Sequence, residues 1–119
     1  MGRRVIAIVD DMFFASKIRA TAEALGVEIS FVRSKDSLLQ KAREKKPDLV
    51  VVDLHNQKLG SAEITQAIRG DEELHDVWIL GFFSHVQVEL QRSAVAAGFN
   101  QVVPRSVFAS DLGKILAGE

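Results

Sequence analysis

Short apolar runs alternate with helical patterns along the whole chain. Runs of strand length occur at Val5–Val9, Glu28–Val32, Leu49–Val52, Val77–Phe82 and Gln101–Val103. The first and third runs are almost continuously apolar and β-branched, which is typical of central strands covered on both faces. We therefore predict five strands, with the first and third buried in the middle of a sheet.

Five helices are predicted after these strands, because apolar residues recur there at three- and four-residue spacing. The apolar stripes run from Phe14 to Leu25, Leu38 to Ala42, Ile64 to Ile68, Leu90 to Ala97 and Phe108 to Leu116. Serines are expected to start three of the helices and glycines to end three. These are Ser34, Ser61 and Ser106 at the starts, and Gly26, Gly70 and Gly98 at the ends. The alternation predicts a doubly wound α/β domain with a parallel sheet, formed as one unit by residues 1–119.

Composition excludes several classes of protein. The net charge of −1 provides no field that would attract nucleic acid or an anionic membrane. The absence of cysteine rules out disulfides and zinc–thiolate sites. No apolar run approaches the roughly 18 residues of a membrane span, and Asp10 and Asp11 interrupt the N-terminal run that a secretory signal would need. We expect a cytoplasmic protein.

Chemically useful side chains follow four of the five predicted strands. Asp10 and Asp11 follow the first strand, Asp53 the third, Ser84 the fourth and Arg105 the fifth. The carboxyl ends of parallel strands lie at one edge of a sheet, and open α/β sheets bind ligands at that edge. Three acids, a hydroxyl and a cation together predict a metal-assisted site for a phosphoryl group.

The order and spacing of these residues resemble those of the response-regulator receiver domain of two-component signalling. The matching pieces are IVDD, VVDL, a strand that ends at serine and a strand that ends near a basic residue. The resemblance covers essentially the whole chain and is closest to single-domain chemotaxis regulators. It implies a flavodoxin-like (βα)5 fold with the strand order 2-1-3-4-5.

The resemblance also implies a role for each acid. Asp53 would be the phosphoacceptor, since a carboxylate can carry a phosphoryl group as a mixed anhydride. Nearby carboxylates repel one another unless a cation lies between them, and Mg²⁺ prefers oxygen ligands. Asp11 and Asp53 would bind Mg²⁺ directly, Asp10 mainly through water, and His55 through its backbone carbonyl.

Ser84 and Arg105 would contact the phosphoryl group in such a site. Ser84 would donate its hydroxyl to a phosphoryl oxygen, or serve only as a helix N-cap. Arg105 would offset the added negative charge, or form a structural ion pair instead. The family usually has lysine followed by proline here, whereas this chain has Pro104 before Arg105. Arginine keeps the charge but is larger, planar and forked.

Three further positions differ from, or flank, the family pattern. Val102 occupies the switch position, where many members have an aromatic residue. His85 and Val86 follow Ser84 and flank the site, and a histidine at that position could screen it. Because Val102 is not aromatic, a switch in which Ser84 couples to an aromatic rotamer is not expected.

We predict a stand-alone receiver that acts in a phosphorelay and is not an enzyme with a substrate of its own. A sensor histidine kinase or a phosphotransfer protein would supply the phosphoryl group. The switched face, around the fourth helix, fifth strand and fifth helix, would bind a downstream protein or a second copy. The alternative is a pseudo-receiver that serves as an adaptor without phosphorylation, suggested by Val102, His85 and Arg105.

Other functions of similar folds fit less well. The acidic first loop, DDMFFA, would repel the phosphate of a flavin. Asp10-Asp11-Met12 does not supply the Asp-x-Asp of a haloacid-dehalogenase-type phosphatase. The chain also lacks GxSxG, GxxxxGK[ST] and GxGxxG motifs.

Overall fold

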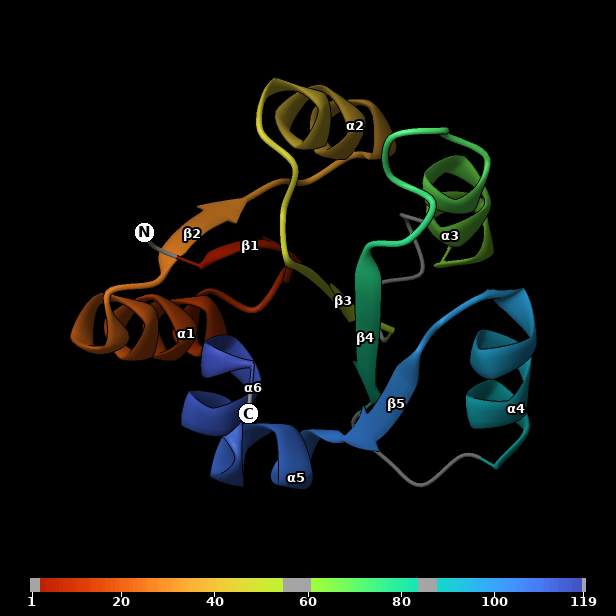
Figure 1. Cartoon of the computed structure of the whole chain (residues 1–119). Coiled ribbons are helices and arrows are strands. Elements are labelled where there is room, and N and C mark those ends of the chain that lie inside the picture. The colour runs from red at the N-terminus through yellow and green to blue at the C-terminus, as the bar shows by residue number, and fades with distance from the viewer. Residues whose placement is uncertain (1–2, 55–60, 84–87, 119) are drawn as a thin grey trace.

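Five parallel strands form one sheet in the order β2-β1-β3-β4-β5 (Figure 1). The computed structural model describes residues 3–54, 61–83 and 88–118. The strands are β1 (Arg4–Ile8), β2 (Glu28–Phe31), β3 (Leu49–Asp53), β4 (Trp78–Phe83) and β5 (Gln101–Pro104). The predicted fold class and strand order are therefore confirmed.

Helices cover both faces of the sheet, as Figure 1 shows. They are α1 (Met12–Leu25), α2 (Lys35–Glu44), α3 (Ser61–Arg69), α4 (Val88–Ala97), α5 (Arg105–Ser110) and α6 (Leu112–Ala117). α1, α5 and α6 cover one face, and α2, α3 and α4 cover the other. In the described part of the chain, no helix has the length and apolarity that crossing a membrane would require.

The central strands supply side chains to two separate cores. In β1, Ile6 and Ile8 face the α2–α3–α4 side, whereas Val5 and Ala7 face the α1–α5–α6 side. All four of these side chains are buried. Side chains of a strand point alternately to opposite faces, so a strand with a core on each side needs a continuous apolar sequence. The predicted burial of the first and third strands is confirmed.

Most predicted helix boundaries agree with the structure, but the last helix differs. Gly26 ends α1 with φ +71°, a left-handed conformation that glycine adopts without strain. The predicted final helix is divided at Asp111 into α5 and α6. The prediction of Ser106 as its N-cap is wrong, because the helix already begins at Arg105, directly after Pro104.

One side chain, Arg69, ties together the loops at the amino edge of the sheet. Its guanidinium donates to the backbone carbonyls of His75 and Val77 at 2.7 Å each, and of Gly98 at 2.8 Å. It also donates to Oδ1 of Asn100 at 2.6 Å. The backbone carbonyls after α3 and α4 thereby gain partners that no helix or strand provides.

Gly81 lies where β4 passes directly beneath the ring of Phe99. A Cβ atom at Gly81 would come within 2.9 Å of Phe99 Cε2 and 3.0 Å of Leu54 Cδ1. Real Cβ atoms do not approach carbon atoms this closely, so the missing side chain at Gly81 is part of the packing. The glycine allows Phe99 to cover the sheet on the α2–α3–α4 side.

Candidate functional site

The predicted acids follow the carboxyl ends of the neighbouring strands β1 and β3, at one edge of the sheet. Ile8 of β1 lies in register with Val52 of β3, so Asp53 ends β3 where β1 continues into Asp10 and Asp11. Asp53 is largely buried, with 8% of its surface exposed, whereas Asp10 is exposed. The parallel register thus places the three residues at one edge of the sheet.

Asp11 has two structural tasks at this edge. It is the N-cap of α1, and its Oδ1 accepts hydrogen bonds from the backbone N–H groups of Phe13 at 3.0 Å and Phe14 at 3.1 Å. Its other oxygen, Oδ2, accepts from Nη2 of Arg105 at 2.5 Å. Both carboxylate oxygens are therefore engaged by the chain itself.

Arg105 reaches this carboxylate from the end of β5. It is the first residue of α5, immediately after β5, and its guanidinium lies 4.5 Å from the ring centroid of Phe14. Such a stack over an aromatic face stabilises the cation and fixes the plane of its fork. Its side chain is 38% exposed and that of Asp11 39%, so solvent screens the pair.

Phe14, Phe82 and Phe108 form an aromatic cluster that supports Arg105 and α5. Phe14 packs edge-on against Phe82 at 5.2 Å and Phe108 at 5.5 Å, and Phe82 stacks on Phe108 at 4.6 Å. Phe14 belongs to the buried stripe of α1, while Phe13 is 87% exposed. The sequence reasoning did not find Phe14 as the support of Arg105. Its position three residues after Asp11, on the buried stripe of the same helix, was the available signal.

The surroundings of Asp11 favour its charged form. The hydrogen bond from Arg105, followed by that from the Phe14 backbone, lowers the pKa of the Asp11 carboxyl. A carboxyl with a lowered pKa in the folded state stabilises the fold at pH values above its unfolded pKa. That stabilisation is lost as the pH falls through the lowered pKa. The ion pair is thus complete at neutral pH.

Replacing Arg105 with glutamine is expected to raise the pKa of Asp11 toward the ordinary aspartate value of about 3.9. The variant removes the guanidinium, which is the largest cause of the lowered pKa. Carbon-13 NMR titration of the aspartate carboxyl carbons would measure the change. Asp76 provides an internal control, because its pKa is lowered by Lys46 and should not move. An unchanged Asp11 pKa would contradict the pairing.

The carboxylates at this edge are of the type that binds magnesium, but in the described residues they are not arranged as a metal site. Carboxylate oxygens are the ligands that Mg²⁺ prefers. Within residues 3–54, 61–83 and 88–118, however, no three acidic or imidazole side chains are grouped closely enough to hold a metal ion. Asp11 instead directs one oxygen to Arg105 and the other to the start of α1. An incoming cation would have to compete with Arg105 for Asp11.

Several predicted site residues lie outside the described residues. These are His55, Ser84, His85 and Val86. Val102 is described, is buried, and belongs to the core on the α2–α3–α4 side. It pairs with Gly81 in the sheet. The roles predicted for all five remain predictions.

Comparison with known proteins supports the same architecture. No protein-family model matches the chain. The chain is 30% identical over 80 residues to the polar-differentiation response regulator DivK of Brucella species, which is 67% of this chain and 65% of DivK. The chain spans less than two thirds of the length of the named relatives that it matches.

Two solved structures show the likeness over nearly the entire chain. The response regulator from Hahella chejuensis has a TM-score of 0.87 and 20% identity, covering 98% of this chain and 93% of that one. The receiver domain of the sensor histidine kinase PA1611 from Pseudomonas aeruginosa has a TM-score of 0.83 and 19% identity, covering 99% and 97%. That structure has magnesium coordinated in its active-site cleft. With its strand order and with the acids at the carboxyl edge of the sheet, the chain has the fold of a CheY-like response-regulator receiver domain.

Proposed function

We propose that this protein is a receiver of two-component signalling that accepts a phosphoryl group on Asp53. The observation that carries the proposal is that Asp10, Asp11 and Asp53 lie at the carboxyl edge of a receiver fold, with Arg105 hydrogen-bonded to Asp11 at the same edge. An oxygen of Asp53 would attack phosphorus as the bond from phosphorus to the donor breaks. The protein would thus act as a signalling phosphoacceptor rather than as an enzyme.

Magnesium would be the cofactor of this site. Asp11 and Asp53 would hold it directly, Asp10 through water and His55 through its carbonyl. When bound, the ion would neutralise charge on the phosphoryl oxygens. The support is the set of oxygen donors at one edge, together with the magnesium in the cleft of the PA1611 receiver domain.

Arg105 would first hold Asp11 and later face the phosphoryl group. Its guanidinium is fixed over Phe14 and is already within hydrogen-bond reach of the acidic edge. A planar fork can bind phosphoryl oxygens by two hydrogen bonds, which a lysine ammonium does not do. Moving Arg105 from Asp11 to the phosphoryl group would also pull on the start of α5, whose first residue it is. Ser84 would donate its hydroxyl to the same group.

The phosphoryl donor would be a sensor histidine kinase or a phosphotransfer protein in the cytoplasm. The fold likeness to the receiver domain of a sensor histidine kinase supports this choice. The output would be a change in the face formed by α4, β5 and α5, which would bind a downstream protein or a second copy of the chain.

Intact-mass spectrometry after incubation with acetyl phosphate and magnesium tests the proposal. The wild type is expected to gain one phosphoryl group, about 80 Da, with the added negative charge described for phosphorylation. Asp53→Asn removes the nucleophile and should show no gain. Asp36→Asn, which changes an exposed acid at the start of α2, should behave as the wild type. Equal labelling of Asp53→Asn would overturn the assignment of the phosphoacceptor.

The second candidate function is an adaptor that works without phosphorylation. Both oxygens of Asp11 accept hydrogen bonds, one from Arg105 and the other from the start of α1. This favours the adaptor, because Asp11 is a predicted magnesium ligand and its oxygens already have partners. In that case neither acetyl phosphate nor a cognate kinase would label the wild type. Magnesium would also leave the backbone amide signals of Asp11 and Asp53 unchanged.

A further inference from the structure

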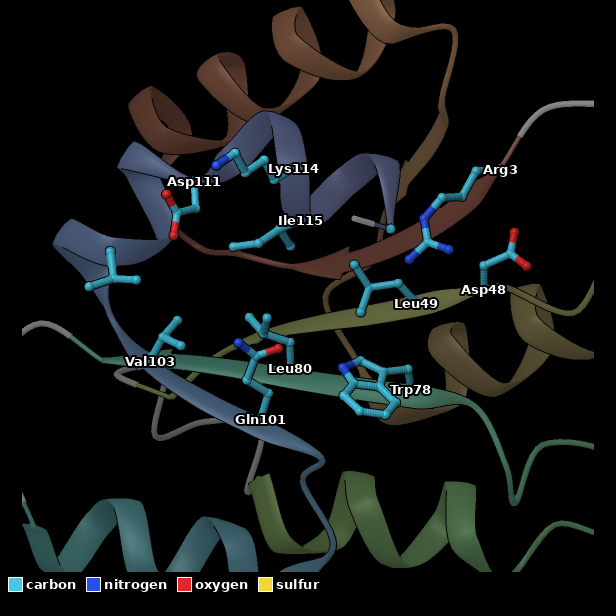
Figure 2. Close-up of a pocket in the computed structure, with 12 residues that line it drawn as sticks. Arg3, Asp48, Leu49, Trp78, Leu80, Gln101, Val103, Asp111, Lys114 and Ile115 are labelled. Atoms are coloured by element: carbon cyan, nitrogen blue, oxygen red, sulfur yellow. The ribbon is translucent and has the colours of Figure 1, made fainter.

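A separate hollow lies at the amino edge of the sheet, opposite the acids. Figure 2 shows it between the starts of β3, β4 and β5 and the final helices. Its volume is about 460 Å³, which is within the range of small-ligand pockets. None of the acids of the phosphoryl site lines it.

Apolar side chains form the floor of the hollow, and the indole ring of Trp78 borders it. Leu49, Leu80 and Val103 form the floor, and Ile115 of α6 faces them (Figure 2). Trp78 lies beside them and is 48% exposed, although it begins a strand of the sheet. β5 starts opposite Leu80, two residues further along β4, so no neighbouring strand flanks the indole on that side. A large aromatic face is therefore open to a ligand.

Charged groups stand at both ends of the hollow. Figure 2 shows Arg3 and Asp48 at one end, and Asp111 and Lys114 at the other. Asp48 accepts a hydrogen bond from the backbone N–H of Arg4 at 2.9 Å. None of the four forms an ion pair with another described residue. Each end thus holds one acid and one base, and the ends differ in that the Asp48 carboxylate already accepts a backbone hydrogen bond and the Arg3 guanidinium is held in place.

Arg3 is held in position with part of its guanidinium free. Its Nε donates to the carbonyl oxygen of Leu116 at 2.7 Å, which ties the start of the chain to α6. The guanidinium also packs so tightly on Gly118 that a Cβ there would lie 2.8 Å from Cζ. Within the described residues, its two Nη groups have no hydrogen-bond partner. The two Nη groups are parallel N–H donors that are already held in position, so they can bind both oxygens of a carboxylate.

We propose that this hollow binds a planar aromatic carboxylate, with its ring on Trp78 and its carboxylate on Arg3. Val5, Leu49 and Trp78 form one row across three neighbouring strands, and Arg3 precedes Val5 by two residues. The backbones of the two anchors are thus two strand spacings apart across the sheet and two residues apart along it, roughly 12 Å in all, and the Arg3 side chain covers part of that distance. A fused two-ring acid bridges that separation along the apolar floor. Gln101, at the start of β5, lines the same side as the indole.

Titration with 2-naphthoate, in the absence of magnesium and phosphodonor, tests the proposal independently of phosphorylation. Trp78 is the only tryptophan, so its indole N–H gives one side-chain signal in a proton–nitrogen NMR spectrum. The signal is expected to shift and saturate with naphthoate. It should respond at least tenfold more weakly to neutral 2-naphthamide, as expected for loss of a charge-assisted pair.

Matched variants separate the two anchors. Arg3→Gln should weaken naphthoate binding roughly tenfold, whereas Arg92→Gln, the same change at an exposed residue of α4, should have no effect. Trp78→Ala should abolish the naphthoate-induced shifts of the Leu80 and Gln101 backbone amides. Since naphthoate and naphthamide are compared on the wild type, the test does not depend on how well a variant folds.

Three outcomes would overturn the proposal. Equal affinity for naphthoate and naphthamide would remove the role of Arg3. The absence of any shift up to about 1 mM ligand, the weakest affinity of interest, would remove the site. A Trp78 signal that changes with protein concentration alone would show that a second copy of the chain occupies the hollow.

Discussion

Replacing Arg105 with glutamine is expected to tighten magnesium binding roughly tenfold, a difference of about 1.4 kcal/mol. The arginine occupies one oxygen of Asp11 and places a positive charge at the edge where the ion would bind. A unit charge about 4 Å from a divalent ion costs about 2 kcal/mol in water, and salt reduces this value. The measurement is a magnesium titration at constant ionic strength, followed by the backbone amide signals of Asp11 and Asp53.

Two control variants define the cause of this effect. Arg105→Lys keeps the charge and should bind magnesium nearly as the wild type does. Arg92→Gln removes an equal charge from an exposed residue of α4 and should leave the affinity unchanged. An unchanged affinity in Arg105→Gln would show that the guanidinium does not compete with the ion. Trp78 fluorescence is a poor reporter here, because Trp78 begins β4 at the edge opposite the acids.

Replacing Phe108 with alanine is expected to reduce the free energy of unfolding by roughly 3–5 kcal/mol. Phe108 is fully buried, stacks on Phe82 and packs edge-on against Phe14. Its removal would leave a cavity beneath α5 and loosen the aromatic support of Arg105. The loss is a large part of the roughly 5–15 kcal/mol that stabilises a typical domain. Urea unfolding, with the midpoint and slope both fitted, measures it.

Val107→Ala provides the matched control for Phe108. Val107 precedes Phe108 on α5 but is 39% exposed, so its truncation should cost less than about 1 kcal/mol. Similar losses for the two variants would mean that the stability of α5 does not come from the aromatic cluster. A small loss for Phe108→Ala alone would show that the core closes over the missing ring.

The sequence was sufficient to predict the sheet and the edge at which the acids lie. Continuous apolar runs identify β1 and β3 as central strands, and parallel strands must end at a common edge. Asp10, Asp11 and Asp53 follow those strands directly, so their placement required no knowledge of side-chain contacts. Helix caps were predictable where glycine or serine has a specific backbone role, as at Gly26 and Ser34.

These sequence patterns do not predict contacts between side chains that lie far apart in the sequence. The pair of Arg105 with Asp11 joins residues 94 positions apart. It depends on the rotamer of Arg105 over Phe14, which no periodicity specifies. The division of the last helix at Asp111 was likewise hidden, because the apolar stripe continues across it. The carbonyl partners of Arg69 become its neighbours only after the chain has folded.

The close approach at Gly81 has a consequence for how this sequence can diverge. The space that a side chain at position 81 would fill is already occupied by Phe99 and Leu54. A larger residue at 81 is therefore compatible only with a smaller one at 99 or 54. The three positions share one fixed volume, and substitutions there should be inherited together rather than one at a time.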